Sequence, residues 1–236
     1  MLILAFETSA KAGSVALLDD SKLLGESYQN TGLTHSQTLL QMAQQLLNDC
    51  GKTPADVTAV AVAQGPGSFT GVRIGVAAAK GFSWGAELPC YGVSTLEAMA
   101  KQLGIWQGYI CPVMDARRSQ VYNAVFHVEC GKCTRIREDR AISLQDLGAE
   151  LQNFKEPIFL VGDGSVLCYN TLLESVPALV LPEEHRMHQR ATGVALLARD
   201  LANAGLAPSG AELEPNYLRL SQAERERAER AAKTKE

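Results

Sequence analysis

The spacing of hydrophobic positions predicts an α/β protein, because strand-like and helix-like patterns alternate along the chain. In the first half, we expect strands at residues 2–8, 14–18, 23–28, 57–63 and 90–93, and helices at 34–50, 70–85 and 95–103. The first helix has a clear start signal, since Thr34 followed by Gln37 fits a capping box, and Gly51 ends it. The run 57–63 is continuously apolar, as in a strand that is buried on both faces.

The second half repeats this order of elements. We expect strands at 109–114, 121–128, from 134 and at 158–161, and helices at 144–153, after the glycine turn 162–165 and at 189–204. The repeated order predicts two similar lobes, an N-terminal lobe at 1–106 and a C-terminal lobe at 107–221. The last long helix is expected to pack back on the N-terminal lobe. Residues 222–236 form a charged tail in which we find no binding motif.

Composition narrows the class of protein. The chain has 236 residues, 46% of them hydrophobic, and a net charge of -4, which is typical of a soluble globular protein and not of one that grips nucleic acid over its whole surface. It shows neither a signal peptide nor an apolar stretch of membrane-spanning length, so we expect a cytoplasmic protein. Cys130 and Cys133 form a lone CxxC pair without further zinc ligands nearby, and we expect two thiols flanking a Gly-Lys hairpin turn.

The glycine-rich stretch QGPGSFTGVRIG, residues 64–75, follows an apolar run and opens a helix, where many proteins bind phosphate. Its glycine spacing fits neither the P-loop, which needs Lys-Ser/Thr where Val72-Arg73 stands, nor the dinucleotide fingerprint, which needs glycine where Thr70 stands. Pro66 also removes a backbone donor. A phosphate site is therefore not expected here.

The helix that follows carries small residues at regular spacing. Gly71, Gly75 and Ala79 lie four apart on one face, with Ala78 beside them, and Gly81 and Gly85 repeat this spacing on another. Such a stripe allows another backbone to approach closely. The sequence leaves two partners open: the chain's own sheet or another subunit.

Few side chains suggest chemistry. Glu7 and Asp115 both stand at the ends of expected strands, where a hydrogen-bonded turn carboxylate is the simpler interpretation and a metal ligand the alternative. His35 is followed one helical turn later by Leu39, so a His-x-x-x-His metal pair is missing. Arg117 and Arg118 stand in a turn, and strand-like alternation would point Arg118 outward. We expect no catalytic residue, cofactor or metal.

Six segments together resemble the TsaB family, formerly called YeaZ. They are AFETSAKAGSVAL (5–17), THSQTLL (34–40), AVAQGPGSFTGVRIG (61–75), YGVSTLEAMA (91–100), MDARRSQVY (114–122) and EPNYLR (214–219). The resemblance runs through nearly the whole chain to about Arg219. It implies a two-lobed protein of the actin-like ATPase (ASKHA, ribonuclease H-like) superfamily.

The resemblance also implies a function. The family takes part in forming N6-threonylcarbamoyladenosine at position 37 of tRNAs that read codons starting with A. Its members are non-catalytic partners of a larger paralogue, TsaD, which holds a metal through a His-x-x-x-His pair; a small ATPase, TsaE, joins the complex. Such proteins bind tRNA through the complex and form homodimers when alone.

The resemblance places the partner interface on the first two helices. In this chain the expected interface residues are His35, Leu39, Met42, Gly71, Ile74, Gly75, Ala78 and Phe82. Arg118 is the candidate for contact with the complex or its tRNA. Two alternatives are an active actin-like ATPase or transferase, which would require tight ATP binding, and a metallopeptidase, against which the missing second histidine argues.

Overall fold

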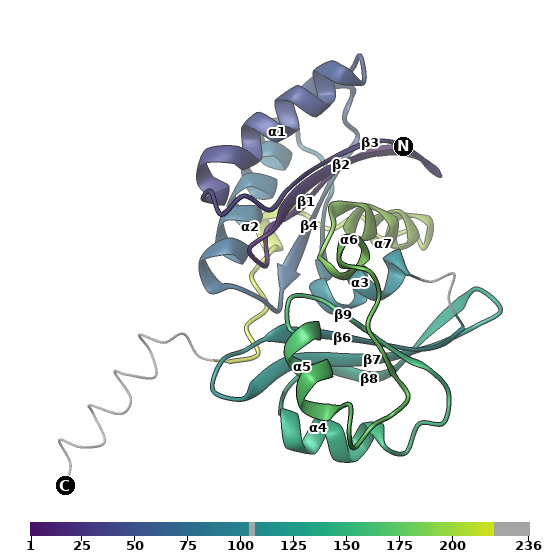
Figure 1. Ribbon diagram of the computed structural model, residues 1–236. Coiled ribbons are helices and arrows are strands. Elements are labelled where there is room, and N and C mark those ends of the chain that lie inside the picture. The colour runs from purple at the N-terminus through teal and green to yellow at the C-terminus, as the bar shows by residue number, and fades with distance from the viewer. Residues whose placement is uncertain (104–106, 220–236) are drawn as a thin grey trace, which may run out of the picture.

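The computed structural model describes residues 1–103 and 107–219, which form two lobes, each built on a five-stranded sheet (Figure 1). The first sheet has the order β3-β2-β1-β4-β5, with β1 Leu2–Glu7, β2 Gly13–Asp19, β3 Lys22–Gln29, β4 Ala59–Gly65 and β5 Cys90–Ser94. The second has the order β10-β9-β6-β7-β8, with β6 Gly108–Asp115, β7 Gln120–Glu129, β8 Lys132–Ser143, β9 Ile158–Val161 and β10 Leu179–Val180.

The two sheets have the same topology. In each, the first three strands form an antiparallel meander, and the fourth strand then pairs with the first in parallel. Leu4 of β1, for example, lies opposite Leu17 of β2 on one side and Val60 of β4 on the other. The duplication that the sequence pattern predicted is thus confirmed at the level of strand order.

Helices cover both faces of each sheet. Their bounds are α1 His35–Asp49, α2 Phe69–Gly85, α3 Thr95–Gln102, α4 Leu144–Leu151, α5 Ser165–Leu172, α6 Glu184–Met187 and α7 Ala191–Asn203, with short 3-10 turns η1 Pro54–Asp56 and η2 Gly210–Glu212. The first two pack on one face of the first sheet, where they share a core with β1, β2 and β4. On the second sheet α4 and α5 cover the outer face.

The remaining two helices cross between the lobes. α7, from the second half of the chain, packs against β1, β2 and β4 of the first sheet through a core that includes Val194, Ala195 and Ala198. α3, from the first half, packs against β6, β7 and β8 through Leu96, Met99 and other buried side chains. The two helices touch each other, because a Cβ on Gly193 would lie 2.2 Å from the carbonyl oxygen of Ala98.

Two local predictions were wrong in detail. Thr34 does occupy the N-cap of α1, but its side chain makes no capping hydrogen bond; the Gln37 amide instead donates to the Thr34 carbonyl oxygen at 2.9 Å. In the β7–β8 hairpin, the two loop residues are Cys130 and Gly131, not Gly131 and Lys132, because both have the positive φ angles (50° and 78°) that a tight hairpin turn requires.

Part of the expected domain organisation lies outside the described residues. The boundary at 104–106 and the charged tail 222–236 are among the residues that the structure does not describe. Within the described ranges, the model contains no helix that combines the length and the apolar character needed to cross a membrane.

Candidate functional site

The glycine-rich loop that follows β4 packs against the chain itself. The Ser68 amide donates to the Ser9 carbonyl oxygen at 2.6 Å, and a Cβ on Gly67 would lie 2.5 Å from the same oxygen. The backbone of residues 8–9 therefore occupies the space that a phosphate would need. The glycines serve close backbone packing, as the mismatch with both phosphate-binding templates indicated.

The small-residue face of α2 makes the same kind of contact. A Cβ on Gly71 would lie 2.1 Å from the Thr8 carbonyl oxygen, and one on Gly75 would lie 2.4 Å from Thr8 Oγ1. The Thr8 hydroxyl also donates to the Gly71 carbonyl oxygen at 2.8 Å. Of the two partners that the sequence left open for these two glycines, the structure places the chain's own first sheet against them, through Thr8 just after β1 and, for Gly75, also Val62 of β4.

The other expected interface residues divide between core and surface. Leu39 and Met42 are buried in the core under α1, at 2% and 5% exposure. Ile74, Ala78 and Phe82 are half-buried along α2 and pack against the edge of that core. His35 is half-buried, and its Nε2 lies 2.7 Å from the Ala10 carbonyl oxygen. Only the half-buried members of the set offer accessible surface.

A second face of α2 is open. Ile74, Ala78, Gly81 and Gly85 recur at i, i+4, i+7 and i+11, and nothing lies within 4 Å of a Cβ built on Gly81 or Gly85. Trp84, near the end of the helix, is 85% exposed. The sequence contained the spacing of Gly81 and Gly85, but it could not show that these glycines, and not Gly71 and Gly75, face outward.

A large cavity of about 1080 Å³ lies between the lobes. Residues 9–12, the Pro66–Gly71 loop, the β6–β7 turn and residues 216–219 line it, together with Asp163. Three carboxylates stand at or just after strand ends in this region: Glu7 at the end of β1, and the cavity-lining Asp115 at the end of β6 and Asp163 just after β9. Strand ends thus bring acids from both halves of the chain together.

Burial changes the protonation of two of these acids. Glu7 is 1% exposed, and desolvation raises its pKa to about 7, although it accepts a hydrogen bond from the Ser9 amide at 2.6 Å. Desolvation within the cleft also raises the pKa of Asp163, and the negative charge of Asp115 adds to the effect. The Gln189 side-chain amide donates to Asp163 at 3.1 Å, while no described residue donates to the buried side-chain oxygen Oε1 of Gln189.

These acids do not assemble into a metal site. Within residues 1–103 and 107–219, no group of three His, Cys, Asp or Glu side chains is placed to hold an ion. Asp115 instead accepts a hydrogen bond from the Arg117 amide at 2.7 Å, which fits the interpretation of this acid as a turn carboxylate.

The turn after Asp115 has an unusual backbone. Arg117, Arg118 and Ser119 have φ angles of 62°, 55° and 55°, so three consecutive residues with side chains adopt the left-handed conformation that favours glycine. Both arginines are exposed. The expectation that strand-like alternation would point only Arg118 outward was wrong, because the turn is left-handed and not extended. Arg117 lines the cavity between the lobes.

A C-terminal strap, residues 214–219, ties the two lobes together across this cavity (yellow-green in Figure 1). The Asn216 amide donates to the Gln64 carbonyl oxygen in the first lobe at 2.7 Å, and Arg219 Nη1 donates to the Ala116 carbonyl oxygen in the second at 2.6 Å. Tyr217 stacks on Phe69 with ring centroids 4.5 Å apart. The sequence contained this motif as EPNYLR, but nothing in its composition indicated that it crosses the cleft.

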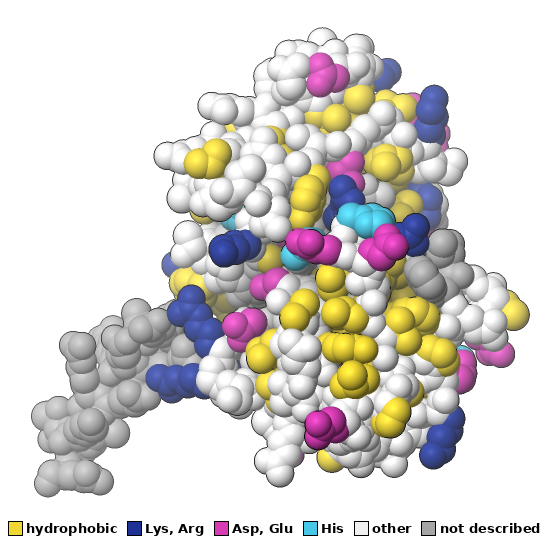
Figure 2. Space-filling model, viewed as in Figure 1, with side chains coloured by type: hydrophobic (Ala, Val, Ile, Leu, Met, Phe, Trp, Pro, Cys, Tyr) yellow, Lys and Arg dark blue, Asp and Glu magenta, His cyan; other side chains and the backbone are white. Residues whose placement is uncertain are grey.

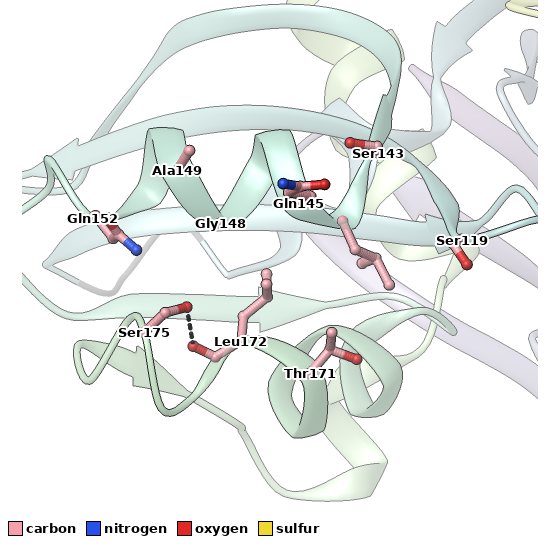
Figure 3. A pocket seen from close by; sticks show the side chains of 10 residues that line it. Ser119, Ser143, Gln145, Gly148, Ala149, Gln152, Thr171, Leu172 and Ser175 are labelled. Carbon is pink, nitrogen blue, oxygen red and sulfur yellow. Dashed lines mark hydrogen bonds between the residues drawn. The ribbon is translucent and has the colours of Figure 1, made fainter.

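A second cavity, of about 610 Å³, lies between α4 and α5 (Figure 3). Small neutral side chains such as Ser119, Gln145, Thr171 and Ser175 line it, and its lining contains no charged group. The helices approach closely here, since a Cβ on Gly148 would lie 2.8 Å from Leu172 Cδ2. This groove lacks the groups for acid–base chemistry or for binding an ion.

Comparison with known proteins gives a consistent picture. A family model described as "TsaD: tRNA N6-adenosine threonylcarbamoyltransferase" matches residues 29–226. The tRNA threonylcarbamoyladenosine biosynthesis protein TsaB of Bacillus subtilis is 32% identical over 226 residues, which cover 95% of this chain and 96% of that protein. The chain belongs to the TsaB family. YeaZ from Pseudomonas aeruginosa, a solved structure, superposes with a TM-score of 0.71 at 25% identity over 92% of this chain and 99% of that one.

The TsaB-family chain has the actin-like ATPase fold. Component A of (R)-2-hydroxyglutaryl-CoA dehydratase from Acidaminococcus fermentans shares this fold, with a TM-score of 0.51 at 12% identity over 86% of this chain and 99% of that one. In this chain the cavity lies between the two lobes, and the glycine loop beside it packs directly on the backbone of residues 8–9.

Proposed function

We propose that this chain is the non-catalytic subunit of the complex that forms N6-threonylcarbamoyladenosine at position 37 of tRNAs reading codons that start with A. The observation that carries the proposal is the start of α1, where a catalytic paralogue of the TsaD type would hold a metal through a His-x-x-x-His pair. Here His35 contacts the Ala10 carbonyl oxygen, and Leu39 is buried in the core at 2% exposure. A metal ligand cannot occupy that second position without leaving a polar group in the core.

The glycine-rich loop supports the same conclusion. This loop after β4 packs on residues 8–9, and the described residues contain no group of three His, Cys, Asp or Glu side chains placed to hold a cation. This environment disfavours a polyphosphate.

The docking surface of the proposed subunit is the open face of α2. Its small residues, Gly81 and Gly85, allow a partner helix to approach closely, and the half-buried Ile74, Ala78 and Phe82 supply apolar contact beside them. The partner is the TsaD-like paralogue, and a second copy of this chain takes the same surface when the protein is alone. A TsaE-like ATPase joins the complex, and Arg118 is the residue that contacts the complex or its tRNA.

Reconstitution tests the proposal. The chain is mixed with the catalytic paralogue and the small ATPase from the same organism, and modified adenosine in tRNA is measured by mass spectrometry of nucleosides. We expect modification to require this chain, and the isolated chain to show no rise in melting temperature with Mg-ATP. Full modification without the chain, or a large stabilisation by Mg-ATP, would contradict the proposal.

Substitutions at Gly81 test the docking surface. Gly81→Trp places a large side chain on the open face and is expected to abolish co-purification with the paralogue, whereas Gly81→Ala, the matched control, retains it. Both variants should melt no lower than the wild-type chain, because nothing within 4 Å obstructs a side chain at this position. If Gly81→Trp binds the paralogue as tightly as the wild-type chain does, the docking surface lies elsewhere.

A further inference from the structure

An aromatic stack stands at the edge of the cavity between the lobes. The Tyr217 ring lies 4.5 Å from the Phe69 ring at an interplanar angle of 24°, and the Arg73 guanidinium lies 3.9 Å from the centre of Phe69. Arg73 Nε also donates to the Tyr217 hydroxyl at 2.7 Å, which fixes the tyrosine in place. Tyr217 nevertheless remains 40% exposed. A fixed and exposed aromatic ring is a surface on which a nucleobase can stack.

Cations surround the same opening. Lys11, Arg117 and Arg219 line the cavity from three separate segments, and Arg118 adjoins Arg117 in the left-handed turn. Neither Arg117 nor Arg118 forms an ion pair with a carboxylate of residues 1–103 or 107–219. Figure 2 shows Lys and Arg side chains in dark blue and Asp and Glu side chains in magenta together along the junction between the lobes. The chain as a whole carries a charge of -4, so this basic patch is a local feature.

The geometry of this edge favours a polynucleotide over a free nucleoside polyphosphate. The glycine loop is filled by the backbone of residues 8–9 and would offer a polyphosphate no cradle of amide groups. A single strand that runs along the edge would instead place its phosphates near the arginines and a base on Tyr217. Spaced cations beside an exposed aromatic ring are the combination that single-stranded nucleic acid requires.

We propose that the edge of this cavity, formed by Phe69, Arg73, Tyr217, Arg117, Arg118 and Arg219, binds single-stranded RNA directly. One unpaired base stacks on Tyr217, and the arginines of the β6–β7 turn and the strap neutralise the flanking phosphates. The inference rests on the proposed function, in which the single strand belongs to tRNA. It goes beyond that function because this chain itself, and not only the complex, contacts the tRNA.

Fluorescence anisotropy with the full isolated chain tests this inference. The probes are a fluorescein-labelled, unstructured 12-nucleotide RNA and a labelled anticodon stem-loop from a tRNA that reads an A-starting codon. We expect both to bind, with an affinity that falls as salt increases. Tyr217→Ala should weaken binding roughly 5- to 150-fold, the effect of losing one base stack. Arg117→Ala and Arg118→Ala should each lower the slope of log affinity against log salt by about 1.

Two control variants distinguish the loss of a base stack from a loss of stability and from the loss of any surface charge. Tyr217→Phe keeps the ring but loses the bond from Arg73, and should bind RNA nearly as the wild-type chain does. Arg137→Ala removes an exposed arginine that pairs with Glu150 in the second lobe, and should change neither affinity nor salt slope. If Tyr217→Ala lowers the melting temperature, the comparison of Arg118→Ala with Arg137→Ala still tests the surface.

Several outcomes would overturn the inference. Displacement of RNA by AMP or ATP at equal concentration would identify a mononucleotide site, and equal displacement by polyglutamate would identify a surface for anions in general. Absence of RNA binding, or equal binding by Tyr217→Ala and the wild-type chain, would refute it even if the reconstituted complex modifies tRNA normally. The proposed function itself fails only if modification proceeds without the chain, so the two failures are distinguishable.

Discussion

The substitution Gly75→Ala provides a quantitative test of how α2 packs on the sheet. A Cβ at this position would lie 2.4 Å from Thr8 Oγ1 and 3.2 Å from Val62 Cγ2, which is closer than non-bonded atoms tolerate. Thr8 would have to rotate, and its hydrogen bond to the Gly71 carbonyl oxygen at 2.8 Å would be lost. The methyl group therefore disturbs both the packing and a buried hydrogen bond.

The magnitude follows from three contributions to the free energy of unfolding. Overpacking costs about 1–3 kcal/mol, and the lost hydrogen bond costs about 1 kcal/mol. Alanine returns about 1 kcal/mol, because it is a better helix former than glycine. The net destabilisation is about 1–3 kcal/mol, which lowers the melting temperature of a chain of this length by roughly 2–12 °C.

Gly81→Ala is the matched comparison, since it makes the same chemical change on the open face of the same helix. Nothing lies within 4 Å of the added methyl group, so only the helix-propensity gain of about 1 kcal/mol remains, and the melting temperature should rise by roughly 2–4 °C. Thermal unfolding followed by circular dichroism at one fixed protein concentration measures both variants. If Gly75→Ala melts as high as Gly81→Ala, the helix does not pack through its glycine face as described.

Two further substitutions test one buried and one half-buried polar group. Burial raises the pKa of Glu7 from 4.5 to about 7, so the folded chain holds a proton that the unfolded chain releases, and the free energy of unfolding should fall by about 3 kcal/mol as pH rises from about 4.5 to 7. Glu7→Gln should remove most of this dependence in melting curves recorded from pH 5 to 8. An unchanged pH profile would show that Glu7 is ionised in the fold. Arg135 of β8 donates hydrogen bonds to Glu97 of α3 and Asp139 of its own strand, and its guanidinium lies 4.7 Å from the centre of the Phe126 ring. Arg135→Met should therefore lower the free energy of unfolding by about 2 kcal/mol in denaturant titrations. An effect below about 0.5 kcal/mol would show that these bonds contribute no more than an exposed surface ion pair.

The sequence could predict the elements because their signals are local. The apolar run at 57–63 predicted the interior strand β4, and helical spacing with Gly51 at the end predicted α1 within one residue of its observed start and end. The repeated order of elements predicted two lobes, because each lobe is a similar folding unit. β10, with two residues, and α6, with four, are too short for any period to show.

The contacts of the site could not be predicted in the same way. Spacing placed Gly71 and Gly75 on one face of a helix, but only the tertiary structure shows that Thr8 lies against that face. The left-handed turn at 117–119 has no local signal, since neither arginine nor serine favours positive φ. Local hydrogen bonds close the turn, and distant residues add to them: the Leu144 amide donates to the Ser119 carbonyl oxygen, and Arg219 bonds the Ala116 carbonyl oxygen from 103 residues away in sequence.

The crossing of α3 and α7 explains how such a site can be rigid without a ligand. Each helix belongs by sequence to one half of the chain and contributes its apolar face to the core of the other lobe. Opening the cleft would therefore expose buried side chains of both lobes, such as Ala98 and Met99, and separate the close contact between Gly193 and Ala98. Packed cores of this kind move between discrete arrangements and do not deform continuously. The strap adds hydrogen bonds to both lobes on the opposite side of the cavity. We therefore expect the two lobes to move as one body.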